Sequence, residues 1–358
     1  MTNSRSLAGY LAAAWALSYG VVAAVWALTG DGYPFGANNP DDQLHPLRAV
    51  PVDIGAAVYA VVLLGVGVLA LASAGRHPIR PRPILLGAGW AAVAALVVLV
   101  PSAHILAVAG YTPMLLIGAP FGWPSDIDYG VIFNWTTANE VWAIVGGLLL
   151  ARALLTWRGP VRSGPVRWGT WVTYVAAAIP ALYAVTRLGL AVGVALGLID
   201  DSFDDPDMAL AATGLGGFAL VGTWLTIGLV HPWGERFPRW MIGLSGRRVP
   251  IKLATIPATA VAIAVAGASA SFLSDPDLIG DMASGEIAMW PMAFWPLWSV
   301  TLLLAAYAYH RRRTAPTGQA VTGSAVGIEA RTASSTGVAE SPKVASASVV
   351  SSTKGRSH

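Results

Sequence analysis

Long apolar stretches alternate with short polar segments along this chain. Most of these stretches approach or exceed the roughly 20 residues that an α-helix needs to cross a bilayer. Charged residues make up 11% of the chain, whereas a soluble domain typically carries about 25%. The pattern therefore predicts an all-α fold, an integral membrane helical bundle in the cell membrane. We expect eight transmembrane helices, at about residues 7–29, 54–74, 84–110, 140–155, 170–199, 208–230, 253–273 and 289–309.

The two ends of the chain differ in character. The first apolar stretch is longer than the core of a secretory signal peptide, which spans roughly 7–15 residues. Val25-Trp26-Ala27 is also a poor cleavage site, so we expect a retained helix. Residues 314–358 are rich in Ala, Ser, Thr and Gly and have no apolar periodicity. This composition predicts a disordered cytoplasmic tail.

The positions of charged residues predict how the helices are oriented. If both termini are cytoplasmic, the inner segments around the helices hold about 16 Lys and Arg residues, and the outer loops hold only Arg48. About 16 of the 19 acidic residues then lie outside. Lys and Arg are retained on the cytoplasmic side of membranes. One helix more or fewer would invert every later loop, so we expect eight spans with the N- and C-termini inside.

The stretch at 170–199 carries one charge, Arg187. A charge inside a membrane helix is costly and usually faces a partner or a water-filled cavity. Helical periodicity places Tyr183 on the side of Arg187 and a stripe of small residues, Gly189, Gly193 and Gly197, on the other side. We expect an ion pair between Arg187 and Glu140, with His104 nearby. The alternative is an arginine that reaches outward to the interface.

His104 is the only histidine within an expected helix, whereas His45 falls in an outer loop. Membrane haem sites usually need two axial ligands, often a pair of histidines on facing helices. His104 has no second histidine of this kind, so we expect no cofactor. A packing role or a proton-relay role remains for this side chain. Few charged residues occur within the expected helices, so we combine those that do with their neighbours into one candidate binding site. Its members are Arg187, Glu140, His104 and Tyr183.

An aspartate-rich segment, DDSFDDPD, follows the stretch at 170–199. It resembles the aspartate-rich motifs of prenyl-diphosphate enzymes, in which carboxylates hold Mg²⁺ against phosphate. The charge pattern places this segment outside, whereas those enzymes meet their substrates on the cytoplasmic side. We therefore expect a solvated acidic loop, with cation binding as the alternative. The residues concerned are Asp200, Asp201, Asp204, Asp205 and Asp207.

The inner segment at 231–252 combines aromatic and basic residues. Aromatic rings settle at the level of lipid headgroups, and arginines are attracted to an anionic leaflet. We expect an anchor to anionic headgroups, with the membrane and not nucleic acid as partner. Its members are Trp233, Arg236, Arg239, Trp240, Arg247 and Arg248. The pattern PWGExFPRW followed by GLxGRRVP resembles a loop in large, mostly uncharacterised families of multi-pass bacterial membrane proteins. The resemblance implies no particular activity.

Several catalytic signatures are missing from the sequence. There is no cysteine, and no Walker A, HExxH or GxSxG motif. The leading hypothesis is a permease-like or small-molecule or lipid-binding helical bundle without a metal site. One alternative is an integral membrane enzyme that acts on a lipid or isoprenoid at the outer face. Another is an accessory or regulatory membrane protein that acts through partners.

Overall fold

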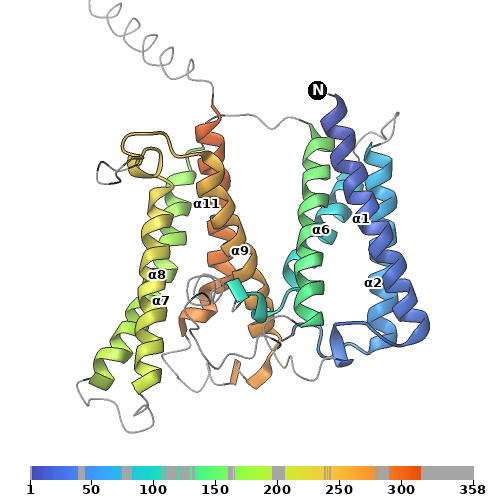
Figure 1. Cartoon of the computed structure of the whole chain (residues 1–358), viewed down its shortest axis with the longest axis horizontal. Helices are drawn as coiled ribbons and strands as arrows, with labels where there is room; N and C mark the ends of the chain where they lie inside the picture. The colour runs from blue at the N-terminus through green and yellow to red at the C-terminus, as the bar shows by residue number, and fades with distance from the viewer. Residues whose placement is uncertain are drawn as a thin grey trace, which may run out of the picture. The chain divides into compact units, whose positions relative to one another are not determined.

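The computed structural model describes most of the chain before residue 316. The described residues are 2–38, 45–74, 83–106, 108–109, 120, 130, 134–159, 164, 166–195, 206–237, 239, 241, 243–277, 279–280 and 290–315. The tail expected at 314–358 therefore falls almost entirely outside them. Among the described residues the fold is helical (Figure 1), and β pairing is limited to one isolated bridge.

The helices of the described part have the following bounds. They are α1 (Thr2–Thr29), α2 (Val52–Ala74), α3 (Pro83–Ala94), α6 (Trp135–Arg158), α7 (Gly169–Ala195), α8 (Pro206–Gly228), α9 (Ile251–Leu273) and α11 (Trp295–Arg313). A π-helical segment, Ala95–Leu99, continues α3, and a 3-10 segment, Trp290–Phe294, leads into α11. Within the described residues, six helices are long and apolar enough to cross a membrane. Shorter apolar helices cover Pro83–Leu99 and Thr213–Gly228.

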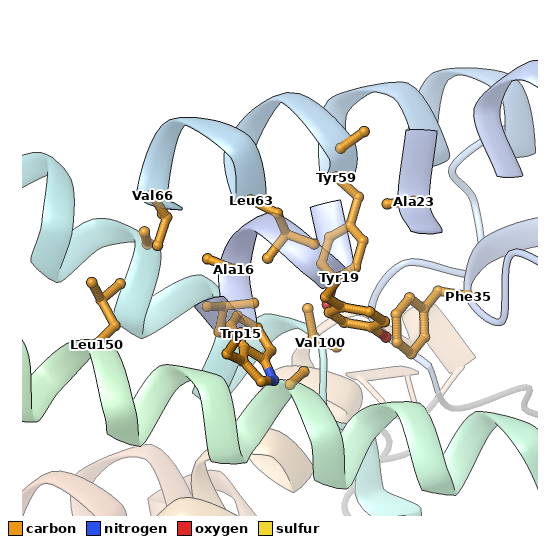
Figure 2. Close-up of a cluster of buried hydrophobic side chains, with 14 of the residues drawn as sticks. Trp15, Ala16, Tyr19, Ala23, Phe35, Tyr59, Leu63, Val66, Val100 and Leu150 are labelled. Carbon is orange, nitrogen blue, oxygen red and sulfur yellow. The ribbon is translucent and has the colours of Figure 1, made fainter. Parts of the chain in front are cut away.

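Helices α1, α2, α3 and α6 share one hydrophobic core, and we call them the first helix group. Figure 2 shows Trp15 and Tyr19 of α1 gathered with Leu63 of α2 and Leu150 of α6. The hydroxyl of Tyr19 donates a hydrogen bond to Asn139 Oδ1 at 2.6 Å, which joins α1 to α6. Aromatic side chains from the loop after α1 pack over this core and close its end. Two of these side chains, Tyr33 and Phe35, are buried.

Helices α7, α8, α9 and α11 form a second helix group. Figure 1 shows α7 beside α8 and α9 beside α11, and α11 also packs against α7. Of the expected glycine stripe, Gly189 is exposed with open space around it, Gly193 is buried, and Gly197 lies outside the described residues. A close approach between α7 and α8 is made at Gly216 of α8. A Cβ at this position would lie 2.9 Å from Leu188 Cγ of α7.

Several helix ends differ from the bounds expected from hydropathy, and three of them bear on the site. The helix expected at 84–110 stops at Leu99, just before Pro101, because proline has no N–H and clashes with the preceding turn. Helix α6 begins at Trp135, where the Asn134 side chain accepts a hydrogen bond from the Thr137 N–H at 2.8 Å. Glu140 therefore lies inside the helix and does not open it. Helix α11 continues through its basic end to Arg313.

Candidate functional site

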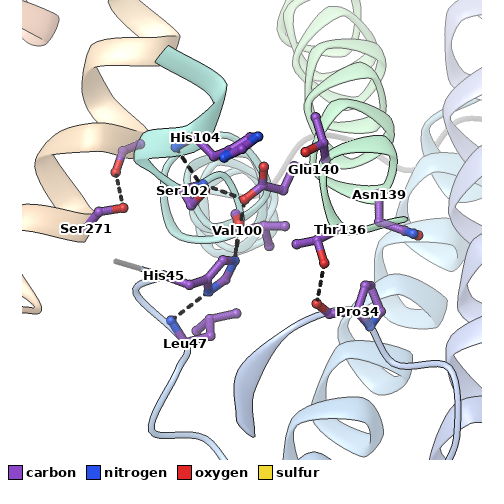
Figure 3. A network of polar contacts seen from close by, with 12 residues as sticks. Pro34, His45, Leu47, Val100, Ser102, His104, Thr136, Asn139, Glu140 and Ser271 are labelled. Carbon is purple, nitrogen blue, oxygen red and sulfur yellow. Dashed lines mark hydrogen bonds and ion pairs between the residues drawn. The ribbon is translucent and has the colours of Figure 1, made fainter. Parts of the chain in front are cut away.

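The break after α3 is the centre of a buried polar cluster. The Val100 N–H still bonds to Ala95 O at 3.0 Å, in the π-helical manner. Beyond Pro101 the chain turns away from the helix, and its backbone groups need other partners. The Ser102 N–H donates to Glu140 Oε1 at 2.8 Å, and the Ala103 N–H donates to Ser271 Oγ at 2.9 Å. Figure 3 shows these contacts converging from α6 and α9.

His45, from the loop between α1 and α2, completes this cluster. Its Nδ1 accepts a hydrogen bond from the Leu47 N–H at 3.0 Å, so Nδ1 carries no proton. Its Nε2 therefore carries the proton and donates to Val100 O at 2.9 Å. The same Nε2 lies 3.6 Å from Glu140 Oε1, and Phe35 stacks on the ring. The contacts define a neutral imidazole beside a carboxyl group.

The cluster is closed to solvent and lies where the two helix groups meet. The exposed fractions of His45, Glu140 and Ser102 are 1%, 0% and 0%. On the α9 side, a Cβ at Gly267 would lie only 3.0 Å from Pro101 O, so this glycine permits the broken segment to approach. The break is thus held by one side chain from each of three other elements, the first loop, α6 and α9.

The structure gives Glu140 and Arg187 different neighbours from those expected. Glu140 faces the break in α3, whereas Arg187 belongs to α7, which packs with α8 and α11. The ion pairs between described residues do not include Glu140 with Arg187. The Arg187 guanidinium lies over the Tyr183 ring, 5.1 Å from its centroid, so the prediction that these two share a face is confirmed.

His104 lies just beyond the break, in a short helical turn. Its backbone N–H donates to Ser102 Oγ at 3.1 Å. The side chain is half-buried, next to the cluster built around Glu140. The site expected from sequence thus divides into two places. Glu140 and His104 belong to the break in α3, and Arg187 and Tyr183 belong to α7.

The aspartate-rich segment contributes little that can be described. Asp200, Asp201, Asp204 and Asp205 lie outside the described residues. Asp207 falls in the first turn of α8, and nothing is described of its side chain. Cation binding by this segment stays a prediction. Across the described ranges, no group of three or more His, Asp or Glu side chains is arranged to hold a metal ion.

The aromatic and basic segment after α8 folds into a hairpin, residues 231–249, in which Pro238, Trp240 and Ile242 are not described. The Phe237 N–H donates to Arg247 O at 3.0 Å, and the Val249 N–H donates to Glu235 O at 2.9 Å. These bonds flank an antiparallel bridge between Arg236 and Arg248. The described ends of the hairpin are therefore paired with each other through their backbones.

The end of α11 holds the hairpin in place. Arg312 Nη2 forms an ion pair with Glu235 at 3.0 Å and also donates to Leu229 O at 2.8 Å. Arg313 Nη2 donates to Val249 O at 3.0 Å, and the Tyr309 hydroxyl donates to Gly234 O at 2.9 Å. In addition, Trp233 stacks on Trp224 of α8 with ring centroids 4.3 Å apart.

The side chains of four hairpin arginines take no part in these contacts with α11 and α8. Arg236, Arg239, Arg247 and Arg248 are exposed, in keeping with the anchor expected from sequence. Contact with lipid headgroups stays a prediction for them. The sequence reasoning missed His45, Ser102 and Ser271, which complete the buried cluster. The signal available in advance was Pro101, because a proline within an apolar stretch leaves backbone groups that polar side chains must satisfy.

The comparisons with known proteins leave the geometry as the only guide to function. No protein-family model matches the sequence, and no curated protein or solved structure is significantly similar to it.

Proposed function

We propose that the protein is a permease-like membrane transport protein. In this proposal a small solute crosses beside the break in α3, and Glu140 carries a coupled proton. The six long apolar helices support a multi-pass membrane protein. The shorter helices α3 and α8 would complete eight spans, and the distribution of Lys and Arg favours cytoplasmic N- and C-termini.

The observation that carries the proposal is the broken helix. Non-helical backbone within a membrane is tolerated where it is buried in protein or lines a cavity. In many transporters, discontinuous helices between two helical repeats form the substrate site. Here the break at Pro101 lies where the first helix group contacts α9 of the second, through the Ala103–Ser271 hydrogen bond. Movement between the two groups would act directly on this segment.

Glu140 is the group suited to carry a proton. Its carboxyl group is buried, and it accepts the Ser102 N–H on the broken segment. Both ring nitrogens of His45 beside it are already hydrogen-bonded: Nδ1 accepts from the Leu47 N–H, and Nε2 donates to Val100 O. Protonation of Glu140 would weaken the hydrogen bond that its carboxylate accepts from the Ser102 N–H. Proton binding would in this way be coupled to the position of the broken segment. A buried ionisable residue of this kind is a functional candidate by default in membranes.

The test is transport by purified protein in liposomes that enclose a pH-sensitive dye. A panel of sugars, amino acids, organic acids, nucleosides and quaternary ammonium ions is added outside, with and without a pH gradient. We expect at least one solute to enter and to change the internal pH. Glu140→Gln keeps an oxygen that accepts from Ser102, so it should stay folded and exchange solute without moving protons.

A matched control is Asp53→Asn, which makes the same chemical change at an exposed carboxyl group in the first turn of α2. It should retain proton-coupled uptake. If no solute of the panel moves faster than in protein-free liposomes, the transport proposal is wrong. If Glu140→Gln couples solute to protons as well as the unaltered protein does, Glu140 only supports the broken helix.

A further inference from the structure

A second feature of the structure lies in the second helix group, remote from the chemistry of the α3 break. A cavity of about 400 Å³ is bounded by α8, the hairpin at 231–249, α9 and α11. This volume falls within the range of small-molecule sites. The residues that line it are nearly all apolar, including Leu225, Phe237, Leu253, Pro257 and Val261. Such a lining suits a hydrocarbon chain better than a polar solute.

Part of the cavity lining from α8 and α9 is exposed. Trp224, Leu225 and Leu253 line it and are 50%, 56% and 55% exposed. Helix α9 is one of the six helices long and apolar enough to cross a membrane, and α8 contains a shorter apolar stretch, so these exposed side chains are suited to contact with acyl chains. From Leu253 to Val261 the lining follows α9 for about 12 Å at the rise of an α-helix. The cavity can therefore take part of one acyl chain directly from the bilayer.

Positive charge gathers at the end of the cavity next to the hairpin. Phe237 lines the cavity, and its backbone bonds to Arg247 on the opposite strand. Arg236 and Arg248 form a bridged pair, and like charges placed opposite each other destabilise a strand pair. Glu235, the acidic residue of the hairpin, is already bound by Arg312. In the part of the hairpin that is described, the exposed arginines have no ion-pair partner.

An apolar cavity beside unpaired guanidinium groups has the two halves of a site for an anionic amphiphile. The planar fork of arginine matches the geometry of phosphate oxygens. We propose that the hairpin and this cavity bind one anionic phospholipid, whose phosphate contacts Arg247 on the strand face that also carries Phe237 and Val249, while Arg236 and Arg248 on the opposite face add positive charge nearby. One acyl chain enters the cavity between α8 and α9. This site does not depend on the transport proposal, since it shares no residue with the cluster around Glu140.

The test measures lipid binding to detergent-purified full-length protein by native mass spectrometry. The probes are phosphatidylglycerol and phosphatidylcholine with the same acyl chains. We expect one phosphatidylglycerol to be retained and phosphatidylcholine to bind at least tenfold more weakly. Inorganic phosphate in excess should not displace the bound lipid, because the chain contributes to binding. Equal retention of the two lipids, or displacement by phosphate alone, would overturn the proposal.

Two variants test the two halves of the site. Arg236→Ala/Arg247→Ala/Arg248→Ala removes the headgroup contact and the positive charge beside it, and each basic residue near a lipid surface contributes enough that affinity should fall on the order of 100-fold. The matched control is Arg152→Ala/Arg158→Ala/Arg167→Ala, which removes three exposed arginines in and after α6. This control should retain the lipid. An equal loss of lipid binding in both triple variants would mean that the lipid is attracted to positive charge in general, and would contradict a defined site.

Gly222→Leu fills the cavity without a clash, because Gly222 lines it and a Cβ there meets open space. The matched control is Gly217→Leu on the same helix, which also meets open space and does not line the cavity. We expect Gly222→Leu, but not Gly217→Leu, to weaken lipid binding at least tenfold. The elution volume and the unfolding temperature of Gly222→Leu should be unchanged. Unchanged binding in Gly222→Leu would refute chain entry. Chain entry would also be refuted if the protein were a dimer that only Gly222→Leu dissociates, because a second copy would then occupy the cavity.

Discussion

Glu140 Oε1 lies 3.6 Å from His45 Nε2, although one residue belongs to α6 and the other to the loop before α2. Both side chains are directed at the same three-residue break in the chain. His45 satisfies the last carbonyl before Pro101, and Glu140 satisfies the first N–H after it. The pair thus replaces the hydrogen bonds that a continuous helix would have made for itself.

Substitution of Glu140 by leucine should destabilise the protein more than substitution by glutamine. Leucine leaves the buried Ser102 N–H without its acceptor, and an unsatisfied buried donor costs about 1–3 kcal/mol. Glutamine offers a carbonyl oxygen at the same position. Thermal unfolding of both variants in detergent micelles measures the difference. Equal unfolding temperatures for Glu140→Leu and the unaltered protein would mean that the contact with Ser102 contributes nothing to stability.

Tyr33 should make the protein sensitive to alkaline pH. Burial raises the pKa of its phenol from 10.0 to about 12. The folded state therefore holds a proton that the unfolded state releases first. The stability that the folded state gains from this pKa difference is fully present below pH 10 and is lost as the pH rises through 12. A shift of two units corresponds to about 2–3 kcal/mol.

The measurement is the unfolding temperature of Tyr33→Phe and of the unaltered protein between pH 8 and about pH 11. Phenylalanine keeps the aromatic contacts with Phe35 and Trp26 and cannot ionise. We expect the unfolding temperature of Tyr33→Phe to fall less steeply as the pH rises. Parallel curves for the two proteins would show that Tyr33 titrates normally.

Gly9 should be intolerant of a side chain because α1 and α2 are in close contact there. A Cβ at Gly9 would lie 2.5 Å from Ala74 Cβ, so Gly9→Leu forces the helices apart. Overpacking of this kind costs about 1–3 kcal/mol. The control is Gly65→Leu in α2, where a Cβ meets open space. Unfolding in detergent should separate the two variants, and equal stability would argue against the close α1–α2 contact.

Arg312 should protect the hairpin at 231–249 from proteolysis. Its guanidinium binds both Glu235 and Leu229 O, and it ties the hairpin to α11. Arg312→Ala should increase the rate of trypsin cleavage within the hairpin severalfold, because the lost contacts are partly exposed and worth about 1 kcal/mol. Arg311→Ala is the control, since the described contact of Arg311 is with Tyr307 on the same helix. Equal cleavage of both variants would show that Arg312 does not hold the hairpin to α11.

Local features of the structure followed directly from the sequence. Within the described part, six apolar stretches form long helices, because helix formation depends on spacing and composition over one or two turns. The shared face of Arg187 and Tyr183 also follows from helical periodicity alone. Pro101 marked the position where helical bonding must fail, although the expectation was a helix that continued past it.

The partners of each polar group were decided by tertiary packing. Glu140 was expected to pair with Arg187 because the helices that carry them are joined by a short loop and were expected to be neighbours. It faces His45 and Ser102 instead, because α6 packs with α3 while α7 packs with α8 and α11. Hydropathy cannot reveal that a loop histidine will be buried, because its burial depends on how the loop closes over neighbouring helices. The sequence thus determined which segments are helical, and the contacts between helices decided which polar groups meet.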